Sequence, residues 1–284
     1  MITLVGVSKS FKRTRVLNEL SLEIAAGDRV ALIGSNGAGK TTLIRCLLGE
    51  YQYSGTISLN GECPRENRKT VLEQIGFVPQ LPPPLKMSVQ QLLNFSAGVC
   101  NCDTAEMESV ATQLGLELEP LYKRPFEKLS GGQKQKLLIA IALGRPTSLL
   151  IMDEPAANLD PEARHTLFSL LEQKQEKSAM LISSHRLDEV ASLVNRVIEL
   201  DRGEVVLDDR VDDSIDLSSI LQCTITTIRV EPAFSKAMNG WGFTTGANEA
   251  EWNGSIPGPD RLRFLGTLSR YAALLSSVEI KEAA

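Results

Sequence analysis

The chain has 284 residues, of which 43% are hydrophobic and 23% are charged, the balance of an ordinary globular protein. Its formal net charge of −5 argues against nucleic acid as a partner, because binding to nucleic acid normally relies on a basic surface. The longest apolar run, residues 137–143, is far shorter than the roughly 18 residues that a membrane span needs. With no signal-peptide core at its N-terminus, the sequence predicts a cytoplasmic protein that meets a membrane only through a partner.

In chain order, the predicted elements alternate between strands and helices. Strand patterns fill the first sixty residues, a helical pattern runs from about residue 87 to residue 143, and "SLLIMDEP" then forms a buried strand. A helix from Pro161, the strand "AMLISSH", a helix from Leu187 and the hairpin "RVIELDRGEVVLDD" follow. This alternation predicts an α/β fold with a mostly parallel sheet, into which a helical subdomain is inserted at about residues 85–145.

A change of composition near residue 208 indicates a second, smaller part. Residues 209–222 are acidic and poor in large apolar side chains, as in a linker. Residues 223–284 predict a β-α-β-α-β order, which is a small α+β module. We therefore expect a main domain at 1–208, a linker at 209–222 and an accessory domain at 223–284.

The five cysteines do not predict a disulfide framework, because their number is odd and the expected compartment is reducing. Cys100 and Cys102 form a C-x-C pair that can hold a soft metal ion or simply lie on a loop between helices. The lack of a neighbouring histidine or further cysteine in the sequence favours the loop.

The segment "VALIGSNGAGKTT" places a glycine loop between a strand and a helix start. It fits the pattern G-x-x-x-x-G-K-[ST], in which backbone N–H groups and the helix N-terminus bind phosphate oxygens. Lys40 would supply a charge to the β and γ phosphates, Thr41 a hydroxyl to Mg²⁺ and Thr42 a contact to the α phosphate. The predicted nucleotide-binding residues of this loop are Gly34, Ser35, Asn36, Gly37, Ala38, Gly39, Lys40, Thr41 and Thr42.

Two acids, Asp153 and Glu154, follow the buried strand in "LLIMDEP". A carboxylate at that position is costly unless it is compensated, and ligands of open α/β sheets bind at the carboxyl ends of strands. We expect Mg²⁺ to compensate Asp153 through a water molecule, and Glu154 to accept a proton from the attacking water as general base. The alternative is an acid pair that merely precedes a helix.

A second anion-binding helix start lies in "LSGGQKQKLLIAIAL" at residues 129–143. The P-loop already accounts for one nucleotide, so this second start is surplus within a single chain. Either it binds something else or it serves a nucleotide held by another subunit, and spacing alone leaves both possibilities open.

The order of these motifs resembles that of the ATP-binding-cassette (ABC) ATPases over about residues 1–205. The matching elements are the P-loop, "FVPQ", "LSGGQ", "LLIMDEP", "NLD" and "SSH". The resemblance implies an ABC-type P-loop NTPase with a mostly parallel core sheet, an antiparallel β subdomain and an inserted helical subdomain. It also implies that two copies pair head to tail around two ATP molecules, so that the signature of one copy caps the γ phosphate held by the other. The signature residues are Ser130, Gly131, Gly132 and Gln133.

The same resemblance assigns roles to single residues. Phe11 stands where the family has an aromatic residue that stacks on adenine, although a buried Phe closing a turn is the alternative. Gln80 is similar to the Q-loop glutamine that senses Mg²⁺ and the γ phosphate, and His185 to the switch histidine. Asp160 matches a residue with an inter-subunit role and can also cap the helix that follows it. Lys136 stands where an arginine is common.

Together these assignments predict ATP hydrolysis with Mg²⁺ as the metal. The predicted catalytic residues are Glu154, His185, Lys40 and Gln80, and the predicted metal site contains Thr41, Gln80 and Asp153.

The resemblance further predicts the ATPase subunit of a transporter, peripheral on the cytoplasmic face of the inner membrane, that drives a separate integral membrane permease. The segment "LPPPLKMSVQQLL" would receive that permease, or it would be a proline-rich surface loop. A soluble ABC ATPase of the repair or translation class is the alternative, disfavoured because those proteins carry long coiled coils or two cassettes. A catalytically silent binding module is disfavoured by Glu154 and His185.

The C-terminal module, with the run "RLRFLGTLSRYAALLSSVEIKE", resembles the tails of export-type ABC ATPases. It is most similar to the tail of the ATPase subunit of the copper-site maturation transporter of nitrous oxide reductase. The alternative is an appendage that only stabilises a dimer.

Overall fold

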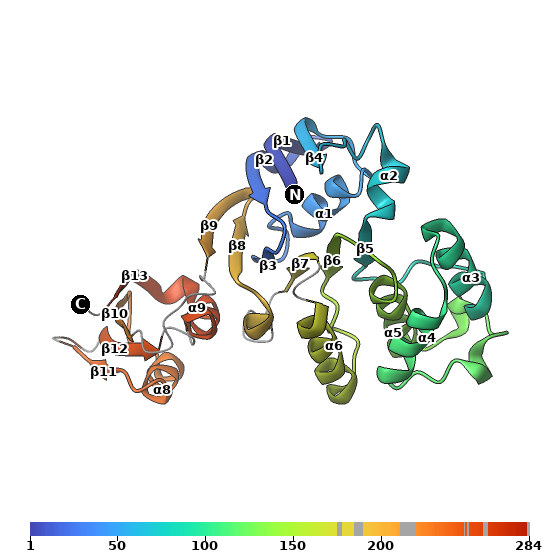
Figure 1. Ribbon diagram of the computed structural model, residues 1–284. Helices are drawn as coiled ribbons and strands as arrows, with labels where there is room; N and C mark the ends of the chain where they lie inside the picture. The colour runs from blue at the N-terminus through green and yellow to red at the C-terminus, as the bar shows by residue number, and fades with distance from the viewer. Residues whose placement is uncertain are drawn as a thin grey trace. The chain divides into compact units, whose positions relative to one another are not determined.

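The computed structural model describes residues 1–174, 178–184, 190–210, 220–246, 248, 250–257 and 261–282. Its chain divides into two compact units (Figure 1). The first consists of residues 1–185 and 196–209, and the second of residues 186–195 and 210–284. The helix predicted from Leu187 starts outside the described residues. None of the helices in the described ranges is long and apolar enough to cross a membrane.

A six-stranded, mostly parallel sheet forms the centre of the first unit, in the order β5-β6-β7-β3-β8-β9. The strands from β5 to β8 pair in parallel, and β9 extends the sheet as the hairpin partner of β8. Their bounds are β3 (Arg29–Ile33), β5 (Ile75–Val78), β6 (Leu149–Asp153), β7 (Ala179–Ser183), β8 (Arg196–Asp201) and β9 (Glu204–Arg210). Every residue of β6 and β7 is buried, as expected for parallel strands covered on both faces. The predicted parallel core sheet is confirmed.

A separate antiparallel sheet of three strands has the order β2-β1-β4. Its strands are β1 (Ile2–Phe11), β2 (Thr14–Ile24) and β4 (Ser54–Leu59). The buried side chains of this sheet, such as Leu4, join one hydrophobic cluster with Leu43 of α1 (Lys40–Leu47) and Leu181 of β7. This shared core fixes α1, and with it the P-loop, between the two sheets. The antiparallel subdomain expected from the family resemblance is thereby confirmed.

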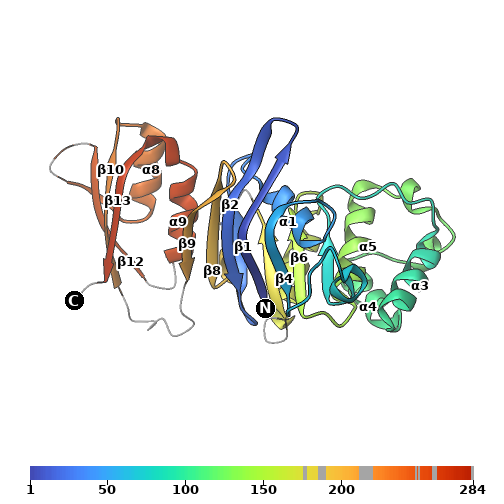
Figure 2. The ribbon, with the colours of Figure 1, turned by 90° about the horizontal axis from the view of Figure 1, so that it is seen from above.

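The inserted helices α3 (Val89–Cys100), α4 (Ala105–Gln113) and α5 (Gly131–Leu143) lie together in both views, between β5 and β6 in the sequence (Figure 2). Helices α3 and α5 each begin with a capping box, in which a serine and a glutamine three residues later satisfy each other's backbone N–H groups. Where α5 ends, Gly144 passes so close to α4 that an added Cβ would lie 2.4 Å from the Cα of Met107. The remaining helices of this unit are α2 (Arg68–Glu73), α6 (Pro161–Lys174) and the short 3-10 turns Glu119–Leu121 and Phe126–Lys128.

The second unit contains a four-stranded antiparallel sheet in the order β11-β12-β10-β13. In chain order its elements are β10 (Ile220–Thr227), α8 (Pro232–Gly240), β11 (Thr244–Thr245), β12 (Glu251–Pro257), α9 (Arg261–Ser269), the 3-10 turn Ala272–Leu274 and β13 (Leu275–Glu282). Phe234 of α8 and Phe264 of α9 share one core with Ile225 and Trp252 of the sheet, so both helices cover the same face. This is the β-α-β-β-α-β arrangement of ferredoxin-like modules.

Three features around and within the second unit differ from the expectation drawn from the sequence. Strand β11 was not predicted, because a strand of two residues is too short to show an alternating pattern. Residues 190–195, expected within the main domain, belong to this unit, where the 3-10 turn Ala191–Leu193 contacts α9. Strands β9 and β10 also reach into the expected linker, of which residues 211–219 lie outside the described ranges.

Candidate nucleotide-binding site

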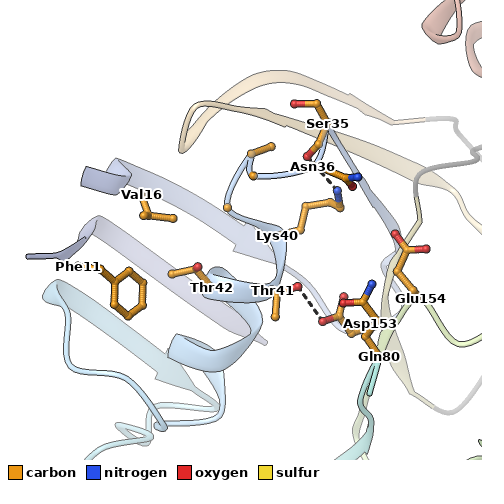
Figure 3. Close-up of a pocket in the computed structure, with 13 residues that line it drawn as sticks. Phe11, Val16, Ser35, Asn36, Lys40, Thr41, Thr42, Gln80, Asp153 and Glu154 are labelled. Carbon is orange, nitrogen blue, oxygen red and sulfur yellow. Dashed lines mark hydrogen bonds between the residues drawn. The ribbon is translucent and has the colours of Figure 1, made fainter. Parts of the chain in front are cut away.

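A cavity of about 540 Å³ opens beside the loop between β3 and α1 (Figure 3). Its walls come from the antiparallel sheet, the glycine loop, the segment that follows β5 and the end of β6, so segments far apart in the sequence meet here. The lining residues are Phe11, Val16, Ser35, Asn36, Gly37, Ala38, Gly39, Lys40, Thr41, Thr42, Gln80, Asp153 and Glu154. Of the predicted P-loop residues only Gly34 lies outside this set.

The glycine loop requires glycine for both backbone angle and space. Gly39 precedes α1 with a φ of 112°, and a Cβ there would lie 2.9 Å from the Cδ2 of Leu17. Lys40 folds back over the loop, where its Nζ donates hydrogen bonds to the carbonyl oxygens of Gly34 at 2.6 Å and Ser35 at 3.3 Å. The loop is therefore curled around the lysine, as a phosphate-binding loop must be.

Lys40 carries its charge in a largely buried position, with 8% of its surface exposed. Burial lowers the pKa of its ammonium group, while the negative charges of Glu154 and Asp153 oppose that shift. The cavity thus holds a cation at the loop and two acids opposite it (Figure 3). A triphosphate group fits this arrangement because its oxygens would satisfy the lysine.

Asp153 is held by two hydroxyl groups at the end of β6. The Oγ1 of Thr41 donates to its Oδ2 at 2.9 Å, and the Oγ of Ser183 donates to its Oδ1 at 2.5 Å. Asp153 is 3% exposed, so these bonds compensate a buried carboxylate. Mg²⁺ prefers oxygen atoms as ligands. The hydroxyl group of Thr41 and the carboxylate of Asp153 supply such oxygens, and the side-chain amide of Gln80 lines the same cavity.

Glu154 has an unusual backbone conformation for a residue other than glycine, with a φ of 53°. Its N–H points to β7, where it donates to the Oγ of Ser183 at 3.1 Å and lies 3.2 Å from the Ser183 carbonyl oxygen. A residue in this left-handed region costs about 1–3 kcal/mol and persists where surrounding contacts enforce it. The strained turn directs the carboxylate of Glu154 into the cavity (Figure 3).

Ser183 is the functional residue that sequence reasoning missed. It is fully buried as the last residue of β7 and touches both acids, yet the motif "SSH" drew attention only to the histidine. The available signal was a hydroxyl group closing an otherwise apolar strand. His185 itself, predicted to contact the γ phosphate, lies outside the described residues.

Phe11 lies at the rim of the cavity with 41% of its surface exposed. Its ring meets that of Tyr51 edge to face, with 5.2 Å between centroids, and the Nζ of Lys9 lies 4.7 Å from its centroid. The alternative of a buried Phe closing a turn is wrong, because the ring is accessible from the cavity. Its predicted contact with adenine remains a prediction.

A second cavity of about 390 Å³ lies at the start of α5. Its lining residues are Gly115, Leu116, Glu117, Pro120, Leu121, Ser130, Gly132, Gln133, Lys136 and Asp160. Ser130 caps α5, where Gly131 is the first helical residue, and its Oγ accepts the N–H of Gln133 at 3.2 Å. The two predicted phosphate-binding helix starts of this chain therefore face different cavities.

Asp160 accepts the N–H of Ala163 at 2.8 Å, which confirms the predicted cap of α6. Its Oδ2 also pairs with the Nζ of Lys136 at 2.8 Å. This lysine hydrogen bond and the cap hold the pKa of Asp160 below its usual range. Within the described ranges no three His, Cys, Asp or Glu side chains cluster as a metal site. The C-x-C pair spans the end of α3, of which Cys100 is the last residue.

Three curated relatives are similar over most of this chain, and a family model described as "ABC transporter" matches residues 17–157. A putative ABC transporter ATP-binding protein of Synechocystis is 38% identical over 202 residues, which cover 69% of this chain and 69% of the relative. The Nod factor export ATP-binding protein I of Rhizobium johnstonii is 35% identical, over 74% of this chain and 69% of the relative. A putative ABC transporter ATP-binding protein of Treponema denticola is 32% identical over 79% of this chain, but the matched part is only 47% of that protein.

Solved structures agree with this pattern. One described as the ATP binding subunit of an ABC transporter superposes with a TM-score of 0.68 at 29% identity. The superposition covers 75% of this chain and 91% of that structure.

Proposed function

Since this chain belongs to the ABC transporter family and is an ATP-binding subunit that hydrolyses ATP, we propose that it works as a head-to-tail homodimer and drives a separate membrane permease. Each P-loop cavity would hold one ATP, and the signature residues of the other copy would close it. Loss of the γ phosphate would remove that bridge and reopen the dimer. To swing such an equilibrium from 1:99 to 99:1, ATP must favour the closed state by about 5.5 kcal/mol.

The observation that supports a shared site is the separation of the two phosphate-directed helix starts. Lys40, Thr41 and Glu154 line one cavity, while Ser130 and Gly132 line another. A γ phosphate bound at Lys40 is thus left without a contact from the signature of its own chain. A second copy in the opposite orientation supplies that contact to both sites at once.

Within one site the chemistry falls to this chain's own groups. Lys40 binds the β and γ phosphates, and the carboxylate of Glu154 takes a proton from the water whose oxygen attacks the γ phosphorus. ADP and inorganic phosphate leave as products. Mg²⁺, held by Thr41, Asp153 and Gln80, would neutralise charge on the phosphates when bound. His185 would contact the γ phosphate.

A membrane partner would dock on the helical part. The segment expected to receive the permease, residues 81–93, exposes the side chain of Leu81 (77%). Helix α3, which begins within that segment, exposes Phe95 (58%) and Val99 (49%) one turn apart. Large apolar side chains exposed side by side on a helix are a feature of interaction sites, which supports docking of a partner on α3. Such docking would place the chain on the cytoplasmic face of the inner membrane.

Export is the proposed direction, because one relative is named a Nod factor export protein. The second unit would serve as an accessory domain, and its resemblance to the copper-maturation ATPase of nitrous oxide reductase makes that system another candidate.

A soluble ATPase of the repair or translation class would leave the exposed side chains of Phe95 and Val99 without a membrane partner. Copurification from solubilised membranes therefore separates the two classes: an integral membrane protein retained by the wild type should be lost from a Phe95→Glu, Val99→Glu variant.

The shared site is tested with two substitutions. Glu154→Gln should keep ATP binding, lower turnover by about 10²- to 10⁴-fold, the usual contribution of a positioned general base, and trap an ATP-bound dimer in gel filtration. Ser130→Arg should abolish hydrolysis without weakening ATP binding to the monomer, because the serine serves the neighbour. Normal turnover in the first variant removes Glu154 from the base role, and normal turnover in the second refutes the shared site.

A further inference from the structure

Gln135 is a polar side chain in a fully buried position on α5, with 0% of its surface exposed. Its Nε2 donates to the carbonyl oxygen of Pro155 at 3.1 Å. Its Oε1 is buried as well and accepts no hydrogen bond from any described residue. A carbonyl oxygen can only accept, so the amide must present its NH₂ group to Pro155, and the assignment of the two amide atoms follows from chemistry.

Packing alone does not explain a glutamine at this position. A buried acceptor without a donor lowers stability, and an apolar side chain of similar volume would avoid that loss. The hydrogen bond to Pro155 is the one specific interaction that the amide makes here.

The bond connects the signature helix with the residue that follows the catalytic base. Glu154, in its strained conformation, is tied to β7 on one side through Ser183. On the other side, the carbonyl oxygen of Pro155 accepts a hydrogen bond from Gln135 of α5. The backbone around Glu154 is thus held between β7 and α5.

Further contacts join the same loop to the start of α5. The Nζ of Lys136 pairs with the Oδ2 of Asp160 at 2.8 Å, at the far end of the loop 155–160. Gly132 also lies so close to this loop that an added Cβ would be 3.3 Å from the carbonyl oxygen of Asn158. A movement of the first turns of α5 would therefore be carried to the whole loop.

We propose that Gln135 is a positioning residue for Glu154, which couples the signature helix of a chain to the base that acts on the ATP of that same chain. The proposal rests on the proposed function, in which Ser130 caps the partner's ATP. Contact of Ser130 with the partner's ATP would fix the position of α5. The hydrogen bond from Gln135 to Pro155 would then fix the backbone next to Glu154. Each chain would then align its own base only when the neighbouring site is filled.

The first test compares Gln135→Met, which keeps the volume but removes the donor, with Lys134→Met as a matched change on the same helix. Turnover should fall about three- to tenfold in Gln135→Met, the rate equivalent of one buried hydrogen bond, and stay at the wild-type level in Lys134→Met. The KM for ATP, and ATP-induced dimerisation in a Glu154→Gln background, should not change in either variant, because the P-loop contacts are intact.

Equal turnover in the two variants, or a loss of dimerisation in parallel with turnover, would overturn the proposal. Thermal unfolding shows whether Gln135→Met is folded. If it is not, Gln135→Asn, which keeps an amide on a side chain too short to reach Pro155, takes its place, and the same split between turnover and dimerisation is expected.

The second test asks in which chain Gln135 acts, using mixed dimers with one Glu154→Gln chain, so that both P-loops bind ATP but only one site hydrolyses it. With Gln135→Met on the chain that keeps Glu154, the rate should fall about three- to tenfold below that of the reference dimer. With Gln135→Met on the Glu154→Gln chain, it should equal the reference. Equal rates in the two arrangements would overturn the role of Gln135. Turnover that survives Ser130→Arg on the Glu154→Gln chain would instead refute the proposed function itself.

Discussion

Replacing Ser183 by alanine should slow ATP hydrolysis without emptying the nucleotide cavity. The hydroxyl donates to the Oδ1 of Asp153 at 2.5 Å, and both residues are buried. A hydrogen bond to a charged group contributes about 1.5–3 kcal/mol. If the transition state, in which Asp153 must hold its position, loses that much stabilisation, the rate of hydrolysis falls about 10- to 150-fold, since 1.36 kcal/mol corresponds to a factor of ten. The N–H of Glu154 keeps the Ser183 carbonyl oxygen as a partner, so the main loss falls on Asp153.

The assay measures steady-state ATP turnover together with the free energy of unfolding in urea. Ser178→Ala is the matched control, because Ser178 is also buried next to β7 but its Oγ donates to the Thr147 carbonyl oxygen at 2.7 Å, near the opposite end of the strand. The control should lose about 0.5–1.5 kcal/mol of stability, as for a neutral hydrogen bond, with wild-type turnover. Turnover of Ser183→Ala equal to that of the control would refute the reasoning, since the hydroxyl would then serve stability alone.

Two further predictions concern the stability and reactivity of the fold. Arg196→Met should lower the free energy of unfolding by about 3–5 kcal/mol in urea titrations, because the buried guanidinium pairs with Asp28 at 2.9 Å and with Asp208 at 2.6 Å, and its loss removes the cation beside the buried Asp28 carboxylate. The double variant with Asp28→Asn should recover part of this loss, and a double variant as unstable as the sum of the singles would contradict this reasoning. Burial raises the pKa values of the Cys46 and Cys223 thiols to about 11. Both thiols should therefore resist a thiol reagent at pH 8 in the native protein and react on unfolding. Their contribution to the free energy of unfolding should be lost as the pH rises from about 9 through 11, because the thiols ionise first in the unfolded chain. Rapid labelling of either cysteine in the native protein would contradict its burial.

The nucleotide cavity could be anticipated from the sequence to the extent that its chemistry is local. Backbone N–H groups, the lysine and the hydroxyl groups of the P-loop all come from one continuous stretch, and Asp153 and Glu154 are adjacent at the end of one strand. Ser183 and Gln135 could not be found in this way. Ser183 bonds Asp153, and Gln135 bonds Pro155, across 20 residues or more of chain. A serine that closes an apolar strand, or a glutamine inside a helix, does not by itself indicate which distant residue it contacts.

Sequence alone determined that the chain carries two phosphate-directed helix starts, because such a site is built by the few residues that form the start of a helix. Tertiary structure alone decided that Lys40 and Ser130 face different cavities, since that depends on how the insertion between β5 and β6 packs against the core sheet. It also decided that the Glu154 backbone is held between β7 and α5. Contacts between distant segments depend on the packing of whole elements, which no short stretch of residues encodes.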